Sequence, residues 1–269
     1  MARIVSSLGL LAFGVAFGAA AFGCSASDGA SGESVGSVAL ASEVDDAVAF
    51  CTGTGQNPNI ILGTPNPDVL NGTPGIDCIF GFGGNDVING ADGNDFIFGG
   101  EGNDTIDAGP GNDNLTDGGP GQDIVNGGEG NDAALQGGEG DDVMSGGNGD
   151  DSLQGGGGQD RLLGNAGNDV LLGDAGDDRL FGGDGDDFLG GGAGNDRLNG
   201  EAGNDIISAS GPGTPGEAGD DISNGGPGND ALIDCIGHNQ QNAGDGSDIC
   251  QFVPGSGTAT SCEEIRTCP

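Results

Sequence analysis

The feature that most constrains this chain is a nine-residue spacing between aspartates. The step is nine at most places, ten at two places and 16 at one, and the final step of 18 equals two nines. A unit this short cannot enclose a core of its own, so the spacing predicts a solenoid whose units stack on one another. The spaced aspartates are Asp68, Asp77, Asp86, Asp95, Asp104, Asp113, Asp123, Asp132, Asp142, Asp151, Asp160, Asp169, Asp178, Asp187, Asp196, Asp205, Asp221, Asp230 and Asp248.

Each unit reads Gly-Gly-x-Gly-Asn-Asp-x-Leu/Ile-x, as in residues 99–107 and 191–199. The glycines allow tight turns with positive φ, and the aspartate supplies a hard oxygen ligand. An apolar eighth residue between two outward neighbours predicts a very short strand with one inward side chain. The expected inward residues are Leu70, Ile79, Ile88, Ile97, Ile106, Leu115, Val125, Ala134, Met144, Leu153, Leu162, Leu171, Leu180, Leu189, Leu198, Ile207 and Leu232.

The residue after each aspartate shows a longer period of 18. Arginine recurs as Arg161, Arg179 and Arg197, while apolar residues take the alternate places. This alternation predicts two units per coil and two parallel sheets, one with an outward arginine row and the other with an outward apolar row.

The unit closely resembles the calcium-binding nonapeptide of the RTX (repeats-in-toxin, haemolysin-type) family. The resemblance implies an all-β fold, a right-handed parallel β-roll with two nonapeptides per 18-residue coil, and multiple bound Ca²⁺ ions. Asp68 and Asp77 lie in degenerate units and are expected to cap the stack. The aspartates that match the family's ligating position are Asp86, Asp95, Asp104, Asp113, Asp123, Asp132, Asp142, Asp151, Asp160, Asp169, Asp178, Asp187, Asp196, Asp205, Asp221 and Asp230.

Physical chemistry also favours calcium in such a stack. Two inward side chains per coil do not offset the entropy cost of ordering 18 glycine-rich residues. Stacking also forms a column of like charges that a divalent cation would neutralise. Carboxylates and turn carbonyls suit Ca²⁺ better than Mg²⁺, and Kd is expected on the order of 10⁻⁴ to 10⁻³ M. The chain is therefore expected to be disordered without calcium and folded with it.

Composition narrows the function classes further. Forty-three acidic residues against five arginines give a net charge of −38, which excludes nucleic acid as a partner and disfavours bare anionic membrane. The chain has one histidine, His238, and neither an HExxH nor a GxSxG motif. These absences predict a protein that is not an enzyme and has no small-molecule substrate.

The N-terminus indicates export. Arg3 is followed by an apolar stretch over residues 4–23, which is typical of a secretory signal. The sequence Ala21-Phe22-Gly23-Cys24 resembles the lipobox of bacterial lipoproteins, although Phe22 departs from the usual small residue, so Cys24 is a candidate lipidation site. Cleavage after Gly23 without lipidation and an uncleaved span remain alternatives. The expected localisation is extracellular or at the cell surface, with outer-membrane anchoring if Cys24 is lipidated.

The cysteines lie only toward the two ends of the repeat region. Lipidation of one of the seven would leave six, which can form three disulfides. A Cys51–Cys78 bridge with two bridges among the last four is the simplest expectation, while Cys235, His238, Cys250 and Cys262 could instead form a zinc site. The six disulfide candidates are Cys51, Cys78, Cys235, Cys250, Cys262 and Cys268.

Four regions follow: a signal peptide (1–23), a flexible tether (24–56), calcium-binding repeats (57–233) and a Cys-rich cap with one late repeat (234–269). The predicted function is calcium binding by an exported, non-catalytic β-roll with a structural, adhesive or surface/matrix role. Alternatives are an accessory module of an exported hydrolase or toxin-like system and a passive calcium reservoir.

A row of apolar residues is the candidate contact surface for a surface or matrix polymer or for self-association. It consists of Val170, Phe188 and Ile206 with Leu172. Ice binding would need a ladder of identical threonines or asparagines, and the third position of the repeat carries none.

Overall fold

A computed structural model describes residues 50, 51, 53, 55, 57–209, 219–234, 240–252 and 258–267. The chain divides into two compact units, Met1–Leu40 and Ala41–Pro269, and all described residues belong to the second. The predicted signal peptide, Cys24 and most of the tether therefore lie outside the described residues. Within the described part, no helix is long and apolar enough to cross a membrane.

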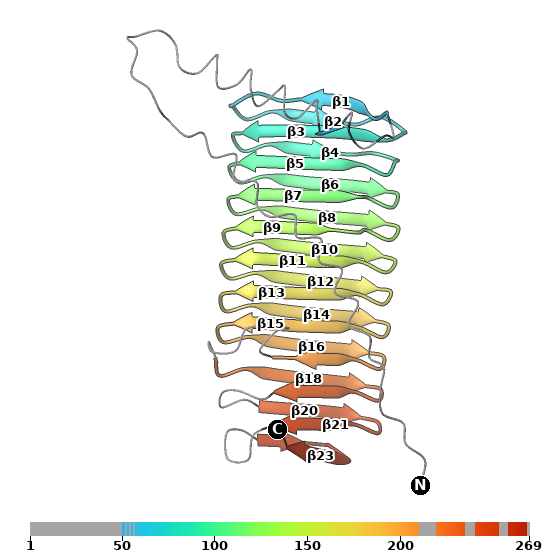
Figure 1. The fold of residues 1–269 in the computed structure, drawn as a ribbon, viewed down its shortest axis with the longest axis vertical. Coiled ribbons are helices and arrows are strands. Elements are labelled where there is room, and N and C mark those ends of the chain that lie inside the picture. Colours follow the sequence, from blue (N-terminus) through green and yellow to red (C-terminus); the bar gives the residue numbers. More distant parts are fainter. Residues whose placement is uncertain are drawn as a thin grey trace, which may run out of the picture. The chain divides into compact units, whose positions relative to one another are not determined.

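The described chain forms two parallel β-sheets that stack strand upon strand in sequence order (Figure 1). The 12-stranded sheet contains β1 (Asn59–Leu62), β3 (Asp77–Gly83), β5 (Phe96–Glu101), β7 (Leu115–Pro120), β9 (Leu135–Glu139), β11 (Ser152–Gly157), β13 (Val170–Ala175), β15 (Phe188–Ala193), β17 (Ile206–Ser208), β19 (Ala231–Asp234), β21 (Ile249–Phe252) and β23 (Glu264–Thr267). The 11-stranded sheet contains β2 (Val69–Asn71), β4 (Val87–Asn89), β6 (Thr105–Pro110), β8 (Ile124–Glu129), β10 (Val143–Asn148), β12 (Arg161–Ala166), β14 (Arg179–Asp184), β16 (Arg197–Ala202), β18 (Ile222–Pro227), β20 (Gln240–Asp245) and β22 (Thr258–Thr260).

The strand register confirms two repeats per coil. Leu162 of β12 pairs with Leu180 of β14, and Leu171 of β13 pairs with Leu189 of β15, so one coil advances by 18 residues. The same register stacks the three arginines on the 11-stranded sheet and the apolar row on the 12-stranded sheet. The predicted all-β, two-sheet solenoid is therefore confirmed.

The core is a single layer of side chains between the two sheets. Nearly every strand contributes its eighth-position residue, and Ile97, Met144 and Leu171 are fully buried examples. The neighbours of most inward residues stay partly or largely exposed, with Cys78 and Gly190 as buried exceptions. Because the core is one side chain thick, each coil buries little apolar surface and gains little hydrophobic stabilisation.

The prediction of an inward side chain is wrong at two positions. Leu115 and Ala134 are only partly buried, whereas Thr116 and Leu135 are 0 % and 1 % exposed and occupy the core positions. Both misassigned positions lie in the ten-residue units, whose extra residue forms a bulge between the aspartate and the inward side chain. Because β7 and β9 carry this bulge in successive coils, Thr116 pairs with Leu135 and the register is kept.

Disulfides staple the described fold near both ends. Cys51 bonds to Cys78 of β3, as expected, and Cys250 of β21 bonds to Cys262. The second bond consumes two thiols that the zinc alternative requires. The remaining two candidates, Cys235 and Cys268, lie outside the described residues.

Phe50 extends the N-terminal staple onto the 12-stranded sheet. Its ring meets Phe96 and Phe98 edge-on at centroid distances of 6.0 and 5.4 Å, and Phe98 stacks on Phe80 at 4.7 Å. Aromatic pairs in these geometries are stabilising. The disulfide and the aromatic contacts therefore hold Phe50 and Cys51 against β3 and β5.

We predict that Thr116→Val stabilises the folded protein. The Thr116 hydroxyl is buried without a hydrogen-bond partner, and valine keeps the shape while removing the unpaired polar atom. The free energy of unfolding should rise by about 1 kcal/mol in urea titrations at saturating calcium. The exposed Thr105→Val should change it little, and destabilisation by Thr116→Val would contradict the prediction.

Candidate metal centre

The repeat aspartates form two ladders, one at each set of turns. The backbone N–H of each aspartate donates to Oδ1 of the aspartate one coil later, as from Asp95 to Asp113 at 2.8 Å and from Asp151 to Asp169 at 2.8 Å. The separation is 18 residues in regular coils, 19 across the ten-residue units and 25 across residues 210–218. Each ladder therefore aligns carboxylates along the stack, as the repeat predicts.

The second carboxylate oxygen, Oδ2, is the unusual atom of this arrangement. In sixteen described aspartates it is buried and has no hydrogen-bond partner in the protein. A buried polar atom without a partner is costly, and a partner-free carboxylate oxygen is costlier. The affected residues are Asp86, Asp95, Asp104, Asp113, Asp123, Asp132, Asp142, Asp151, Asp160, Asp169, Asp178, Asp187, Asp196, Asp205, Asp230 and Asp248.

Turn glycines leave the space in front of these oxygens open. A β carbon on Gly118 would lie 2.5 Å from Oδ2 of Asp123 and 2.7 Å from the carbonyl oxygen of Gly137, closer than side-chain atoms approach. The repeat's first glycine is thus required because carboxylate and carbonyl oxygens converge there. The fourth-position glycine Gly102 has φ of +134°, a conformation that only glycine adopts readily.

This donor set fits Ca²⁺. No cluster of three or more His, Cys, Asp or Glu side chains forms within the described residues. A cation between coils must therefore take many of its ligands from backbone carbonyls. Ca²⁺ accepts six to eight carboxylate and carbonyl oxygens in flexible geometry, whereas zinc prefers nitrogen and sulfur ligands.

Burial also raises the pKa of the ladder carboxyls. Desolvation raises the pKa of Asp113, Asp151 and Asp178 to about 7 and that of Asp95 to about 6. The hydrogen bond from the preceding aspartate's backbone amide lowers it in part, and the neighbouring carboxylates in the ladder raise it again. Without a cation, the ladder therefore holds protons more tightly than an exposed aspartate does.

The N-terminal aspartates differ from the rest. Oδ2 of Asp77 accepts the backbone N–H of Thr73 at 2.6 Å and its hydroxyl at 3.1 Å. Thr64 makes the same two contacts to Asp68, at 2.6 and 2.8 Å. Because these carboxylates have protein partners for the oxygen that is free elsewhere, their geometry agrees with the capping role predicted for the first two units.

The C-terminal end contains a ladder member that the site prediction omitted. Asp248 is fully buried with an unpartnered Oδ2, and its N–H donates to Oε2 of Glu263 at 2.6 Å. Glu263 lies 15 residues away and outside the repeat phase, so spacing could not reveal it. Asp221 was predicted as a ligand and accepts the N–H of Asp196, but its Oδ2 is not among the unpartnered oxygens.

A second, more exposed ladder runs beside the first. Where asparagine or aspartate precedes a ladder aspartate, its side chain accepts a hydrogen bond from the equivalent residue one coil later, as Asn168 N–H donates to Asp150 Oδ1 at 2.8 Å. Asn195 N–H donates likewise to Asp177 at 2.8 Å. These bonds explain the asparagine or aspartate at the fifth position of the repeat, because both side chains offer a carbonyl-type acceptor.

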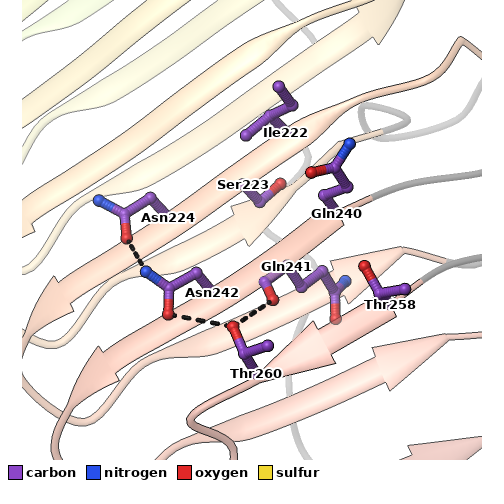
Figure 2. Close-up of a pocket in the computed structure, with 8 residues that line it drawn as sticks. All are labelled: Ile222, Ser223, Asn224, Gln240, Gln241, Asn242, Thr258 and Thr260. Carbon is purple, nitrogen blue, oxygen red and sulfur yellow. Dashed lines mark hydrogen bonds between the residues drawn. The ribbon is translucent and has the colours of Figure 1, made fainter.

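The 11-stranded sheet also carries an open hollow of about 330 Å³ near its C-terminal end (Figure 2). Seven of its eight lining residues carry an amide or hydroxyl group, and Asn224, Asn242 and Thr260 form a hydrogen-bonded chain across it. None of the lining residues titrates near neutral pH, so this hollow offers no general acid or base. Its residues are Ile222, Ser223, Asn224, Gln240, Gln241, Asn242, Thr258 and Thr260.

Fold and site together define a parallel β-solenoid whose turns present oxygen ligands for a cation. Models of the RTX calcium-binding nonapeptide repeat match residues 62–97, 80–115, 117–133, 136–171, 154–189, 190–211 and 216–232. These matches cover more than half of the chain, so the chain belongs to this family. The repeat is a structural calcium-binding fold and is not catalytic by itself. No curated protein matches the chain.

We predict that acid stabilises the metal-free fold. Because the folded-state pKa of many ladder carboxyls is raised from 3.8 to about 6 or 7, their contribution is complete below about pH 4 and is lost as pH rises through about 7. Chelator-treated protein should gain β-type far-UV circular dichroism between about pH 8 and about pH 5. Loss of structure on acidification in this range would contradict the prediction.

We predict that neighbouring members of one ladder respond differently to loss of charge. Asp95→Asn removes a carboxylate whose Oδ2 has no protein partner, so the calcium concentration at the folding midpoint should rise about twofold or more. Asp77→Asn, the control, changes a carboxylate already bonded to Thr73 and should shift this midpoint little. Equal shifts measured by circular dichroism would reject the distinction.

Proposed function

We propose that this protein is an exported, non-catalytic β-roll that folds by binding several Ca²⁺ ions and then serves a structural or adhesive role outside the cell. Family membership supports calcium binding itself. The finer parts of the proposal are the ion sites, the absence of catalysis and the surface role.

The observation that carries the proposal is the set of buried, unpartnered Oδ2 atoms. Sixteen such oxygens cannot be accommodated as structural acids, because each would need a hydrogen-bond donor or a proton. Calcium between adjacent coils would supply the missing partner to many of them at once. We therefore assign Ca²⁺ ligation to the sixteen aspartates predicted from the repeat, with Asp248 added and Asp221 the weakest member.

Calcium binding would couple directly to folding. The ligands come from successive coils, so no site exists before the coils stack, and binding energy becomes folding energy. The thin core leaves most of the stabilisation to the ions. Extracellular calcium concentrations suit sites of the expected affinity.

Export is supported by several features of the chain. The two described disulfides indicate an oxidising compartment. The N-terminal pattern of residues 1–23 supports secretion, and we propose lipidation at Cys24 as the anchor that would retain the protein at a cell surface.

The outward apolar row is the proposed contact surface for a matrix polymer or another copy. Val170, Phe188 and Ile206 are neighbours on β13, β15 and β17, with Val170 and Ile206 39 % and 42 % exposed. Leu172 lies beside the row on β13 and is half-buried.

Calcium-driven folding can be tested on the chain that begins at residue 24, with Cys24→Ser and its other cysteines oxidised. Far-UV circular dichroism should show a cooperative gain of β signal with calcium that chelator reverses, because the ladders need a cation. Magnesium should give little of this signal, because it demands a tighter octahedron and retains its water.

Asp151→Asn and Asp150→Asn provide a matched pair for the same titration. The first changes a buried ladder carboxylate, and the second changes an exposed acceptor that asparagine can replace. Only Asp151→Asn should raise the calcium requirement. A metal-free chain that is already folded and indifferent to calcium would reject the proposed function.

A further inference from the structure

Three of the chain's five cationic side chains stand in one row. Arg161, Arg179 and Arg197 lie on β12, β14 and β16, and the strand register places each directly beside the next. All three are exposed. Adjacent strands are about 4.8 Å apart, so the row concentrates three guanidinium groups within roughly 10 Å.

The arginine row forms no ion pair among the described residues. Within the described part of the chain, no carboxylate oxygen lies within 4.0 Å of these three guanidinium groups. Asp177 is close enough that Arg197 contributes to lowering its pKa, although hydrogen bonds from Asn195 contribute more. Like charges side by side on a sheet are destabilising. In a chain with 43 acidic residues, three adjacent exposed arginines are the densest positive patch that the described structure offers.

The neighbouring outward row is uncharged and partly apolar. Leu163, Phe181 and Asn199 pair in register beside the arginines and are half-buried. The Arg161 guanidinium lies 5.4 Å from the centroid of the Phe181 ring, a cation–π contact that orients it. Apolar side chains also border the row lengthwise, since Val143 precedes Arg161 and Ile222 follows Arg197.

We propose that this face of the 11-stranded sheet binds a linear acidic polysaccharide. The planar fork of arginine pairs with carboxylate or sulfate groups through two parallel hydrogen bonds. Repetition of the fork at each strand suits a polymer that carries an anionic group on successive sugars. Leu163 and Phe181 offer an apolar platform for the carbon-bound hydrogens of the sugar rings.

Other anionic partners fit less well. Duplex nucleic acid carries one charge per about 1.7 Å of helix axis and needs a wide basic face, whereas this row is one residue wide. An anionic membrane gains only about 1 kcal/mol per basic residue, and this narrow row supplies three. Because the face exists only when the coils are stacked, the inference rests on the proposed calcium-driven folding.

The test is isothermal titration calorimetry of the calcium-loaded chain with galacturonate hexasaccharide, with maltohexaose as the uncharged control. Arg179→Gln should weaken binding about tenfold, because it removes the central fork. Arg266→Gln changes the net charge equally but lies on β23 of the other sheet, and it should have little effect. The triple arginine-to-glutamine variant should abolish binding, and the triple lysine variant should restore it only in part.

Circular dichroism of the same samples separates the two proposals. Failure of calcium to fold the chain would reject the proposed function, whereas a folded chain without saturable binding would reject this inference alone. Equal losses from Arg179→Gln and Arg266→Gln would also overturn it. So would arginine-dependent binding of duplex DNA or phosphatidylglycerol vesicles as tight as that of the hexasaccharide, because the partner would then belong to another class.

Discussion

The structure depends on one repeated interaction, the hydrogen bond from the backbone N–H of an aspartate to Oδ1 of the aspartate one coil later. It fixes the carboxylate in the turn and orients Oδ2 toward the open space beside a glycine. The glycines, the short strands and the thin core all follow from the need to bring these oxygens together. The same bond aligns like charges, so the arrangement that builds the turns also brings buried carboxylates of like charge close together.

Much of this organisation could be predicted from spacing alone. A nine-residue step with an 18-residue alternation determines two strands per coil, two sheets and two columns of aspartates, because stacked repeats have no other way to keep the pattern in phase. The rows of Arg161, Arg179 and Arg197 and of Val170, Phe188 and Ile206 were placed correctly for this reason. Periodicity fixes position wherever the period is constant.

The remaining features could not be predicted, because they depend on where the period breaks or on contacts between residues out of phase. The length of a ten-residue unit does not show whether the extra residue lies before or after the inward side chain. Thr116 is polar, so its hydropathy does not mark it as a core residue. Glu263 accepts the N–H of Asp248 in the place of a repeat aspartate, although it lies outside the repeat spacing. Only the geometry shows that Thr64 and Thr73 donate hydrogen bonds to the first two repeat aspartates. The carboxylate partners were decided by local hydrogen bonding, and the place of Thr116 by the bulge in its strand.

The ladders also have a direction. Every carboxylate receives its amide from the coil that precedes it in the chain, and the first coils are completed by their own threonines and a disulfide. For a chain that reaches calcium with its N-terminus first, each new coil finds its hydrogen-bond donor already in place. Stacking can then proceed one coil at a time from the N-terminal end, because each added coil brings the acceptor for a donor that is already held in the coil before it.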